Sequence, residues 1–388
     1  MIRPMAAADL DQYRWVGDEL ADSAVTGYFG EFRAANPGEL FGCLVRHTKL
    51  PPEEMNPALR RFFAQGSAVP DWVDAEAVRR GQRFFNRLVA HHFSALYLAS
   101  LPSSYAAAKG VQVLRMTGRL QTDTQRRLNE TAQLLMDVAG PGTLDPGGSG
   151  IDRILHVRLM HAAVRWMIQS DPSVVRVEHV SPPQTETAQL LWSTSWGVPV
   201  NQEDLAGTWL TFTSVVYDAF DASGVDYTDN DIADHLHMWR LVAHYLGLDP
   251  HLVPLTRAEA DDLRRRIFSR QQLPCAAGRA MTEALVAQAH HHLPKLTWPL
   301  LPTAFRHFLG DRVANIVDLP PANWSRAIFP VMTAMSRIMT AGADSHRLHA
   351  KFDAFVGRRL MDGILREMRH GARPAFSIPV HLAETAAR

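Results

Sequence analysis

Residues 149–168 read SGIDRILHVRLMHAAVRWMI, a stretch whose apolar residues recur with helical spacing around one histidine, His161. Four apolar residues lie seven and four positions before His161 and three and seven positions after it: Ile154, Val157, Val164 and Ile168. At 3.6 residues per turn, all five positions share one face of a helix. The pattern therefore predicts a buried helix that points an imidazole ring into the interior.

Clear signals delimit this predicted helix. The glycines at 147–148 interrupt the preceding structure, and Pro172 follows the far end. Ser149 and Asp152 have the spacing of a weak capping box. The residues alone leave the role of His161 open, because buried histidines that hydrogen-bond to a carbonyl or a water are common.

The sequence around His161 resembles that of a known family. Residues 157–165, VRLMHAAVR, resemble the signature segment of the rubber oxygenase (latex-clearing protein) family, which also includes an oxygenase of mycophenolic acid biosynthesis that cuts a prenyl side chain. In this family the histidine is the proximal ligand of a b-type haem. The resemblance therefore implies that His161 ligates haem iron.

Further segments resemble the family and occur in the family's order, so the resemblance covers most of the chain. They are WVGDELADS (15–23), LPSSYAAAKGVQVLRMTGRL (101–120), NQEDLAGT (201–208), HLHMWRLVAHYLGLDPHLVP (235–254) and residues 376–382. Ordered matches of this kind argue against chance similarity.

The composition is typical of a globular protein. Of the 388 residues, 46% are hydrophobic and 21% are charged, and no linker divides the chain, so we predict a single domain over residues 1–388. The formal net charge is zero, which argues against nucleic acid or an anionic membrane surface as a partner. Two isolated cysteines, Cys43 and Cys275, do not form a disulfide framework and suit a reducing compartment.

The N-terminal sequence favours a cytoplasmic protein. Residues 1–20 contain neither the apolar core of a secretion signal nor a twin-arginine motif, whereas secreted rubber oxygenases carry an export signal. No uncharged apolar run approaches the ~20 residues that span a bilayer, so we expect no membrane span. The sequence does not indicate an oligomeric state.

Helical spacing dominates the chain, and we predict an all-α fold of many helices around a buried haem. The predicted helices cover residues 9–34, 53–65, 74–108, 122–138, 149–168, 201–221, 228–247, 256–272 and 345–370, with others after residue 277. Asn201 and Thr256 are expected to begin two of them, with Asp204 and Glu259 three residues further on. Residues 174–180 alternate briefly and predict one edge strand.

A group of polar residues lies on the helix predicted before residue 149. Arg127, Glu130 and Thr131 stand at positions i, i+3 and i+4, so their side chains share one helix face. From spacing alone, a surface pair of Arg127 and Glu130 beside a tolerated threonine is the simpler interpretation. In the rubber oxygenase family an arginine, a lysine and a threonine with this arrangement cover the distal face of the haem, and the lysine can bind the iron. The resemblance implies that all three are catalytic distal groups, with Glu130 in place of the lysine.

The resemblance implies a haem b-dependent oxygenase for a small hydrophobic, isoprenoid-like unsaturated substrate, with cleavage of a C=C bond or insertion of oxygen. The glutamate leaves the oxidant open between dioxygen and peroxide. A carboxylate beside Arg127 suits peroxide chemistry, because Glu130 can move a proton between the two peroxide oxygens. A haem peroxidase or peroxygenase is therefore the second hypothesis, and a haem carrier or gas sensor without turnover is the third.

Two arginines flank His161, three residues before it and four residues after it. Arg158 and Arg165 are candidates to bind the haem propionates, and ordinary ion pairing at the helix surface is the alternative.

Other histidines have open roles. His237 and His244 are seven residues apart and share a helix face, so they lie near the cofactor or pack in the core, and His235 is equally undecided. His91 and His92 are adjacent and face different ways, so they cannot ligate one metal ion together.

Overall fold

The computed structural model describes residues 7–31, 43–44, 48–50, 52–117, 124–170, 174–185 and 191–327. Within these residues the regular structure is almost entirely helical, which confirms the all-α prediction. The α-helices are α1 Ala7–Tyr13, α2 Glu19–Glu31, α4 Pro57–Gly66, α5 Ala75–Arg87, α6 Val89–Ala95, α7 Leu101–Tyr105, α8 Gly110–Met116, α9 Thr124–Ala139, α10 Ser149–Ser170, α11 Gln202–Phe212, α12 Ser214–Ser223, α13 Asp229–Tyr245, α14 Arg257–Gln271, α15 Ala276–His292, α16 Leu301–Leu309 and α17 Asp311–Ile316. A π-helical turn, Leu96–Ser100, joins α6 to α7, and short 3-10 turns lie at Thr194–Trp196, Pro250–Leu252, Lys295–Leu300 and Trp324–Ala327.

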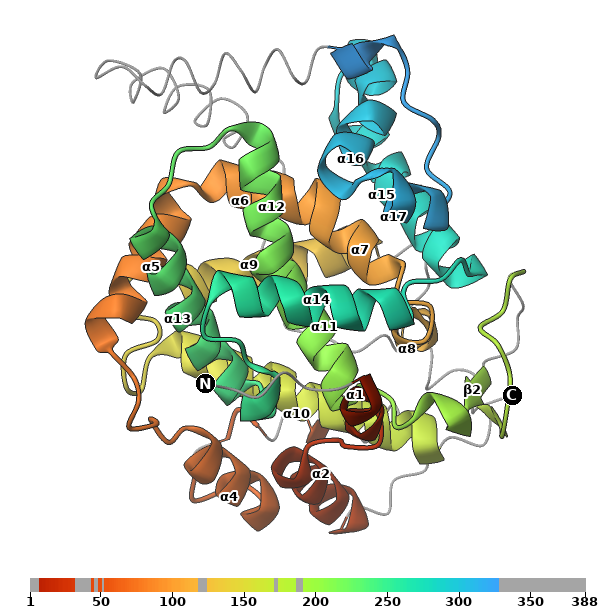
Figure 1. Ribbon diagram of the computed structural model, residues 1–388. Coiled ribbons are helices and arrows are strands. Elements are labelled where there is room, and N and C mark those ends of the chain that lie inside the picture. Colours follow the sequence, from red (N-terminus) through yellow and green to blue (C-terminus); the bar gives the residue numbers. More distant parts are fainter. Residues whose placement is uncertain are drawn as a thin grey trace.

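Helix α10 lies within the largest hydrophobic cluster. It packs against α2, α9 and α13, and α13 packs along α5 (Figure 1). The predicted apolar stripe of α10 is buried at Ile154, Val164 and Ile168 and half-buried at Val157. Figure 1 shows α15, α16 and α17 together at the end of the molecule away from α2 and α4, where a second cluster joins them to α7 and α8.

Side-chain caps place several helix starts where the sequence predicts them. The side chain of Asn201 accepts a hydrogen bond from the backbone N–H of Asp204 (2.9 Å) and begins α11. Thr256 and Glu259 form the predicted capping box of α14. The start of α10 differs, because Ser149 is already its first helical residue and is not a cap.

The predicted helix over residues 9–34 is wrong as a single element. It divides into α1 and α2, because the side chain of Asp18 accepts a hydrogen bond from the backbone N–H of Ala21 (3.2 Å) and starts a new helix.

The predicted helix over residues 74–108 also divides. Leu88 has φ −111° and ψ 28°, outside the helical region, and separates α5 from α6. The π-helical turn then lies just before Pro102, which has no N–H to donate and does not fit the interior of a regular helix. As a result, α5 and α7 point in different directions (Figure 1).

Two further expectations need correction. The predicted helix over residues 201–221 breaks at Thr213 (φ −121°, ψ −88°), which separates α11 from α12. The edge strand is shorter than predicted: β1, Val175–Val177, pairs in parallel with an unpredicted strand, β2, Leu191–Ser193. The predicted helix over residues 345–370 lies outside the described residues, and the single domain over residues 1–388 stays a prediction.

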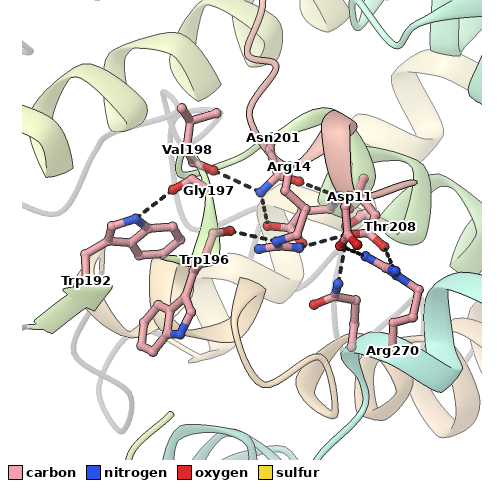
Figure 2. Close-up of polar contacts among 12 residues, drawn as sticks. Asp11, Arg14, Trp192, Trp196, Gly197, Val198, Asn201, Thr208 and Arg270 are labelled. Atoms are coloured by element: carbon pink, nitrogen blue, oxygen red, sulfur yellow. Dashed lines mark hydrogen bonds and ion pairs between the residues drawn. The ribbon is translucent and has the colours of Figure 1, made fainter. Parts of the chain in front are cut away.

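A buried charged network joins α1, α11 and α14 (Figure 2). Glu203 is fully buried and accepts hydrogen bonds from Arg14 (3.1 Å), Arg270 (2.9 Å) and Gln271 (2.8 Å). Arg14 also donates to Asp204 (3.0 Å). Because a buried charge without a partner is costly, this network fixes the packing of three helices that are far apart in sequence.

Candidate cofactor site around His161

His161 lies in the middle of α10, and its ring makes no hydrogen bond to the described part of the chain. Its Nδ1 atom is sealed from solvent without a partner, while the ring as a whole stays partly accessible. Since nearly all buried polar groups in proteins have a hydrogen-bond partner, an unpartnered ring is a departure that needs an explanation. A nitrogen ligand that binds a group from outside the chain has this property.

The surroundings keep the His161 ring neutral. The pKa of His161 is lowered to about 4, chiefly by burial and to a smaller extent by the charge of Arg165, while the charge of Asp18 opposes the shift. A neutral imidazole has a free lone pair, which is the form that binds a metal ion. The electrostatics of the site therefore fit a nitrogen ligand to iron.

Arg158 forms a buried ion pair with the start of α2. Its Nε and Nη2 atoms donate to the two carboxylate oxygens of Asp18 at 2.6 and 2.8 Å. Asp18 also begins α2, so this bidentate pair connects α10 to the first turn of its neighbour.

Arg165 forms a second clamp between the same helices. Its Nη1 atom donates to Asp22, while Nε and Nη2 donate to the carbonyl oxygens of Pro199 (3.0 Å) and Val200 (2.8 Å). Both arginines thus form ion pairs, but these are not the surface pairs of the alternative interpretation: the arginine side chains are only 12% and 4% exposed, and their partners belong to α2 and its first turn.

A glycine covers each of these ion pairs. A Cβ atom on Gly17 would lie 2.5 Å from Asp22 Oδ2, and one on Gly247 would lie 2.4 Å from Asp18 Oδ2. Gly247 also has φ +75°, which side chains rarely tolerate.

Sequence reasoning did not identify Asp18 and Asp22, although both lie in the family-like segment 15–23. They are four residues apart and share a helix face, as do Arg158 and Arg165, seven residues apart. This matching of two acidic and two basic positions is the signal that the sequence offers for the ion pairs. It does not show that these two helix faces lie against each other.

The helix that carries the predicted distal residues lies beside α10. Helix α9 packs directly against it and buries Leu135 and Val138, as the apolar pattern predicts. Glu130 and Thr131 are half-buried, and the side chain of Arg127 lies outside what the structure describes. The structure thus brings the two helices together, and the distal roles of these three residues stay predictions.

His237 and His244 pack around an indole near the surface. The ring of His237 lies 5.6 Å from that of Trp72 and accepts a hydrogen bond from the backbone N–H of Asp74 (3.0 Å). The ring of His244 lies 6.3 Å from Trp72, and Arg240 lies 4.4 Å above the same ring. The shared helix face is confirmed, and Trp72 is what these side chains contact.

Three further findings concern the described residues outside this site. In the described ranges, no group of three or more histidine, cysteine or acidic residues is arranged to hold a metal ion. A surface groove of about 800 Å³ between α5 and α13 is lined by Arg80, Arg83, Arg87, Asp231 and Asp234, among others, and contains none of the predicted site residues. Among the helices described, none is both long and apolar enough to cross a bilayer.

The fold and the site define a helical protein whose central helix presents a half-buried, neutral histidine, His161, with a buried and unpartnered Nδ1 atom. Comparison with known proteins identifies the family: the model described as "ER-bound oxygenase mpaB/B'/Rubber oxygenase, catalytic domain" matches residues 54–340, and the chain belongs to this family of oxygenases. The resemblance seen in the sequence is thereby confirmed.

Two relatives illustrate the similarity. Rubber oxygenase of Streptomyces sp. (strain K30) is 26% identical over 314 residues, which cover 79% of this chain and 71% of that protein. The structure of the latex clearing protein LCP in its closed state matches with a TM-score of 0.67 and 22% identity, over 95% of both chains. This structural match supports the all-helical fold.

Proposed function

We propose that this protein is a haem b-dependent oxygenase that acts on a hydrophobic, isoprenoid-like unsaturated substrate, with His161 as the axial ligand of the iron. The observation that carries the proposal is the His161 ring, which is held neutral by burial and whose Nδ1 atom is sealed from solvent without a hydrogen-bond partner. Family membership supports the reaction class, because the relatives it resembles are named as oxygenases. Bound haem would supply the iron at which dioxygen or peroxide is activated.

The polar residues of α9 are proposed to act on the oxidant that bound haem would activate. Glu130 holds or moves a proton, Arg127 stabilises developing negative charge and Thr131 donates a hydrogen bond. The packing of α9 on α10 supports this assignment, since it brings both candidate groups into one region.

Arg158 and Arg165 are proposed to act beside His161. Binding of the haem propionates stays a prediction, and each guanidinium would then serve both an aspartate and a propionate. Their pairs with Asp18 and Asp22 already support a second contribution, which is to fix the height and rotation of α10 and thereby aim the imidazole.

The first test is the visible spectrum of the purified protein, with and without dithionite and carbon monoxide. The proposal expects a haem spectrum that responds to carbon monoxide. His161→Ala should lose most of the haem, whereas His156→Ala should keep it. His156 is a matched control on α10, because its Nδ1 atom bonds to the carbonyl oxygen of Asp152 in its own helix (2.7 Å). Full haem content and an unchanged spectrum in His161→Ala would refute the ligand assignment.

The second test separates the candidate activities. The protein is incubated with polyisoprene emulsion and with short prenylated compounds, under dioxygen or with added peroxide, and carbonyl products are trapped and counted. Carbonyl products that require dioxygen support the oxygenase. Products that require peroxide favour a peroxygenase, and haem that binds carbon monoxide without turnover indicates a carrier or sensor.

A further inference from the structure

A second buried polar cluster lies apart from the proposed site. It consists of His92 from α6, Tyr217 from α12, and His235 and Trp239 from α13, with exposed fractions of 1%, 0%, 0% and 5%. Apolar rings enclose it, and the ring of Phe85 lies 4.4 Å from that of His92. The proposed oxygenase chemistry does not use these residues.

Four polar contacts connect the cluster. Three form a chain from Leu88 through His92 and His235 to Tyr217, and the fourth joins Trp239 to His235. His92 Nδ1 lies 3.1 Å from the carbonyl oxygen of Leu88, and His92 Nε2 lies 3.2 Å from His235 Nε2. His235 Nδ1 lies 3.0 Å from the hydroxyl of Tyr217. The indole N–H of Trp239 donates to His235 Nε2 at 3.1 Å.

With neutral rings, no placement of the hydrogens satisfies all four contacts. The Leu88 carbonyl only accepts, so the one hydrogen of His92 sits on Nδ1 and leaves Nε2 bare. The indole of Trp239 only donates, so His235 Nε2 should be bare too, and two lone pairs then face each other. If His235 instead carries its hydrogen on Nε2, the indole N–H faces another N–H. Each arrangement therefore leaves one contact unmet.

A relay of two protons removes this conflict. If the hydroxyl proton of Tyr217 passes to His235 Nδ1 and the Nε2 proton of His235 passes to His92 Nε2, no two lone pairs and no two hydrogens face each other. The bare His235 Nε2 atom is then shared by two donors, His92 Nε2–H and the indole N–H of Trp239. His92 is then an imidazolium beside the Phe85 ring, a position in which an aromatic face stabilises a cation.

Acid–base equilibrium alone does not drive this transfer. Burial raises the pKa of Tyr217 and lowers the pKa of His92 and of His235, so the resting groups stay neutral. Removal of one electron from the phenol changes the balance, because an oxidised phenol is a strong acid.

We propose that Tyr217 is a redox-active tyrosine that gives up one electron to an oxidant while its proton moves into the His235–His92 pair. The O–H bond of Tyr217 breaks and an N–H bond forms at His235 Nδ1, while the hydrogen on His235 Nε2 passes to His92 Nε2. The electron leaves to a one-electron acceptor, either an oxidised metal complex or the oxidised haem iron of the proposed function. Reduction of the phenoxyl radical returns the proton.

The position of Tyr217 suits electron exchange with the exterior. Arg257 lies 5.8 Å from the centre of its ring, is about 29% exposed, and donates a hydrogen bond to Tyr227 (2.7 Å). Tyr217 thus lies one layer of side chains below the surface, a distance that an electron crosses without opening of the fold.

The test uses light-generated tris(bipyridine)ruthenium(III) as the oxidant, so that it does not depend on haem or on oxygenase activity. After illumination of the purified protein and freezing, electron paramagnetic resonance should show a tyrosyl radical, identified by ring-deuterated tyrosine. Tyr217→Phe should lose this signal. Tyr245→Phe should keep it, because Tyr245 is equally buried but its hydroxyl has no partner in the described chain. An undiminished signal in Tyr217→Phe, or a radical on tryptophan, would overturn the proposal.

A measurement on the unmodified protein guards against misfolded variants. Since the proton stays within the cluster, radical formation should release no proton to a pH-indicator dye and should be slower in D₂O. Release of one proton per radical, or an equal rate in D₂O, would refute the transfer to the histidine pair.

Discussion

Arg158 in α10 and Asp18 at the start of α2 are 140 residues apart in sequence and form a bidentate ion pair with N–O distances of 2.6 and 2.8 Å. The pair is nearly enclosed, with exposed side-chain fractions of 12% and 5%. It lies one helical turn from His161 and fixes the helix that presents this ring.

Loss of this pair should destabilise the fold. Asp18→Ala leaves the Arg158 charge without its partner and removes the cap of α2, and we expect a loss of about 3–5 kcal/mol in the free energy of unfolding. Urea unfolding followed by circular dichroism measures this change. Glu76→Ala is the control, because the Glu76–Arg79 pair is exposed to solvent and should contribute little to the free energy of unfolding. Equal losses in the two variants would contradict the prediction.

Gly247 should not tolerate a side chain. Gly247→Ala places a Cβ atom 2.4 Å from Asp18 Oδ2 and 2.5 Å from Arg158 Nε, in a backbone conformation with φ +75°. Gly147→Ala separates the two causes, because Gly147 has the same φ of +75° with no atom within 4 Å. Both variants should lose about 1 kcal/mol from backbone strain, and Gly247→Ala should lose more through the clash. Thermal unfolding compares the two variants. Similar melting temperatures would show that the Arg158–Asp18 pair makes room for the Cβ atom without loss of stability.

Glu130 should affect activity more than haem content. If it transfers a proton in the proposed reaction, Glu130→Gln keeps haem and loses roughly a hundredfold in turnover. Glu130→Lys should shift the resting spectrum toward six-coordinate haem, because an amine binds iron better than a carboxylate does. Both variants are titrated with dioxygen and with peroxide. If they keep the parent's spectrum and rate, Glu130 is a surface partner of Arg127 and not a distal group.

Acid should destabilise the protein through its buried histidines. Burial lowers the pKa of His92 to about 3 and the pKa of His235 well below its usual value. Between about pH 6.5 and pH 3 the unfolded chain therefore binds protons that the folded chain excludes. The contribution of these two rings to the free energy of unfolding is fully present above about pH 6.5. It falls as the pH drops, by up to about 1.4 kcal/mol per pH unit for each ring. His92→Gln should flatten this slope in urea titrations, and a slope equal to that of the parent protein would contradict the prediction.

Local patterns account for what the sequence predicts well. The stripe around His161 identifies α10, and the capping pairs locate the starts of α11 and α14, because each depends on residues within one or two turns. The three-residue strand β2 is too short to produce a pattern.

Contacts between distant segments account for what the sequence does not predict. The break at Leu88 separates two helices whose apolar periodicity continues across it, so that only packing determines where the break falls. The pairing of Arg165 with Asp22, and of Glu203 with Arg14, likewise depends on which helix faces meet. These pairs join residues more than one hundred positions apart, beyond the reach of spacing rules.

Two ion pairs on one helix prevent α10 from shifting along its axis or rotating relative to α2. Arg158 and Arg165 lie two turns apart on α10 and both hold the first turns of α2, so the pair of helices moves as one body. Any motion that would let haem reach His161 must then come from the other helices that pack against α10. The other helices that pack against α10 are α9, which carries Glu130, and α13.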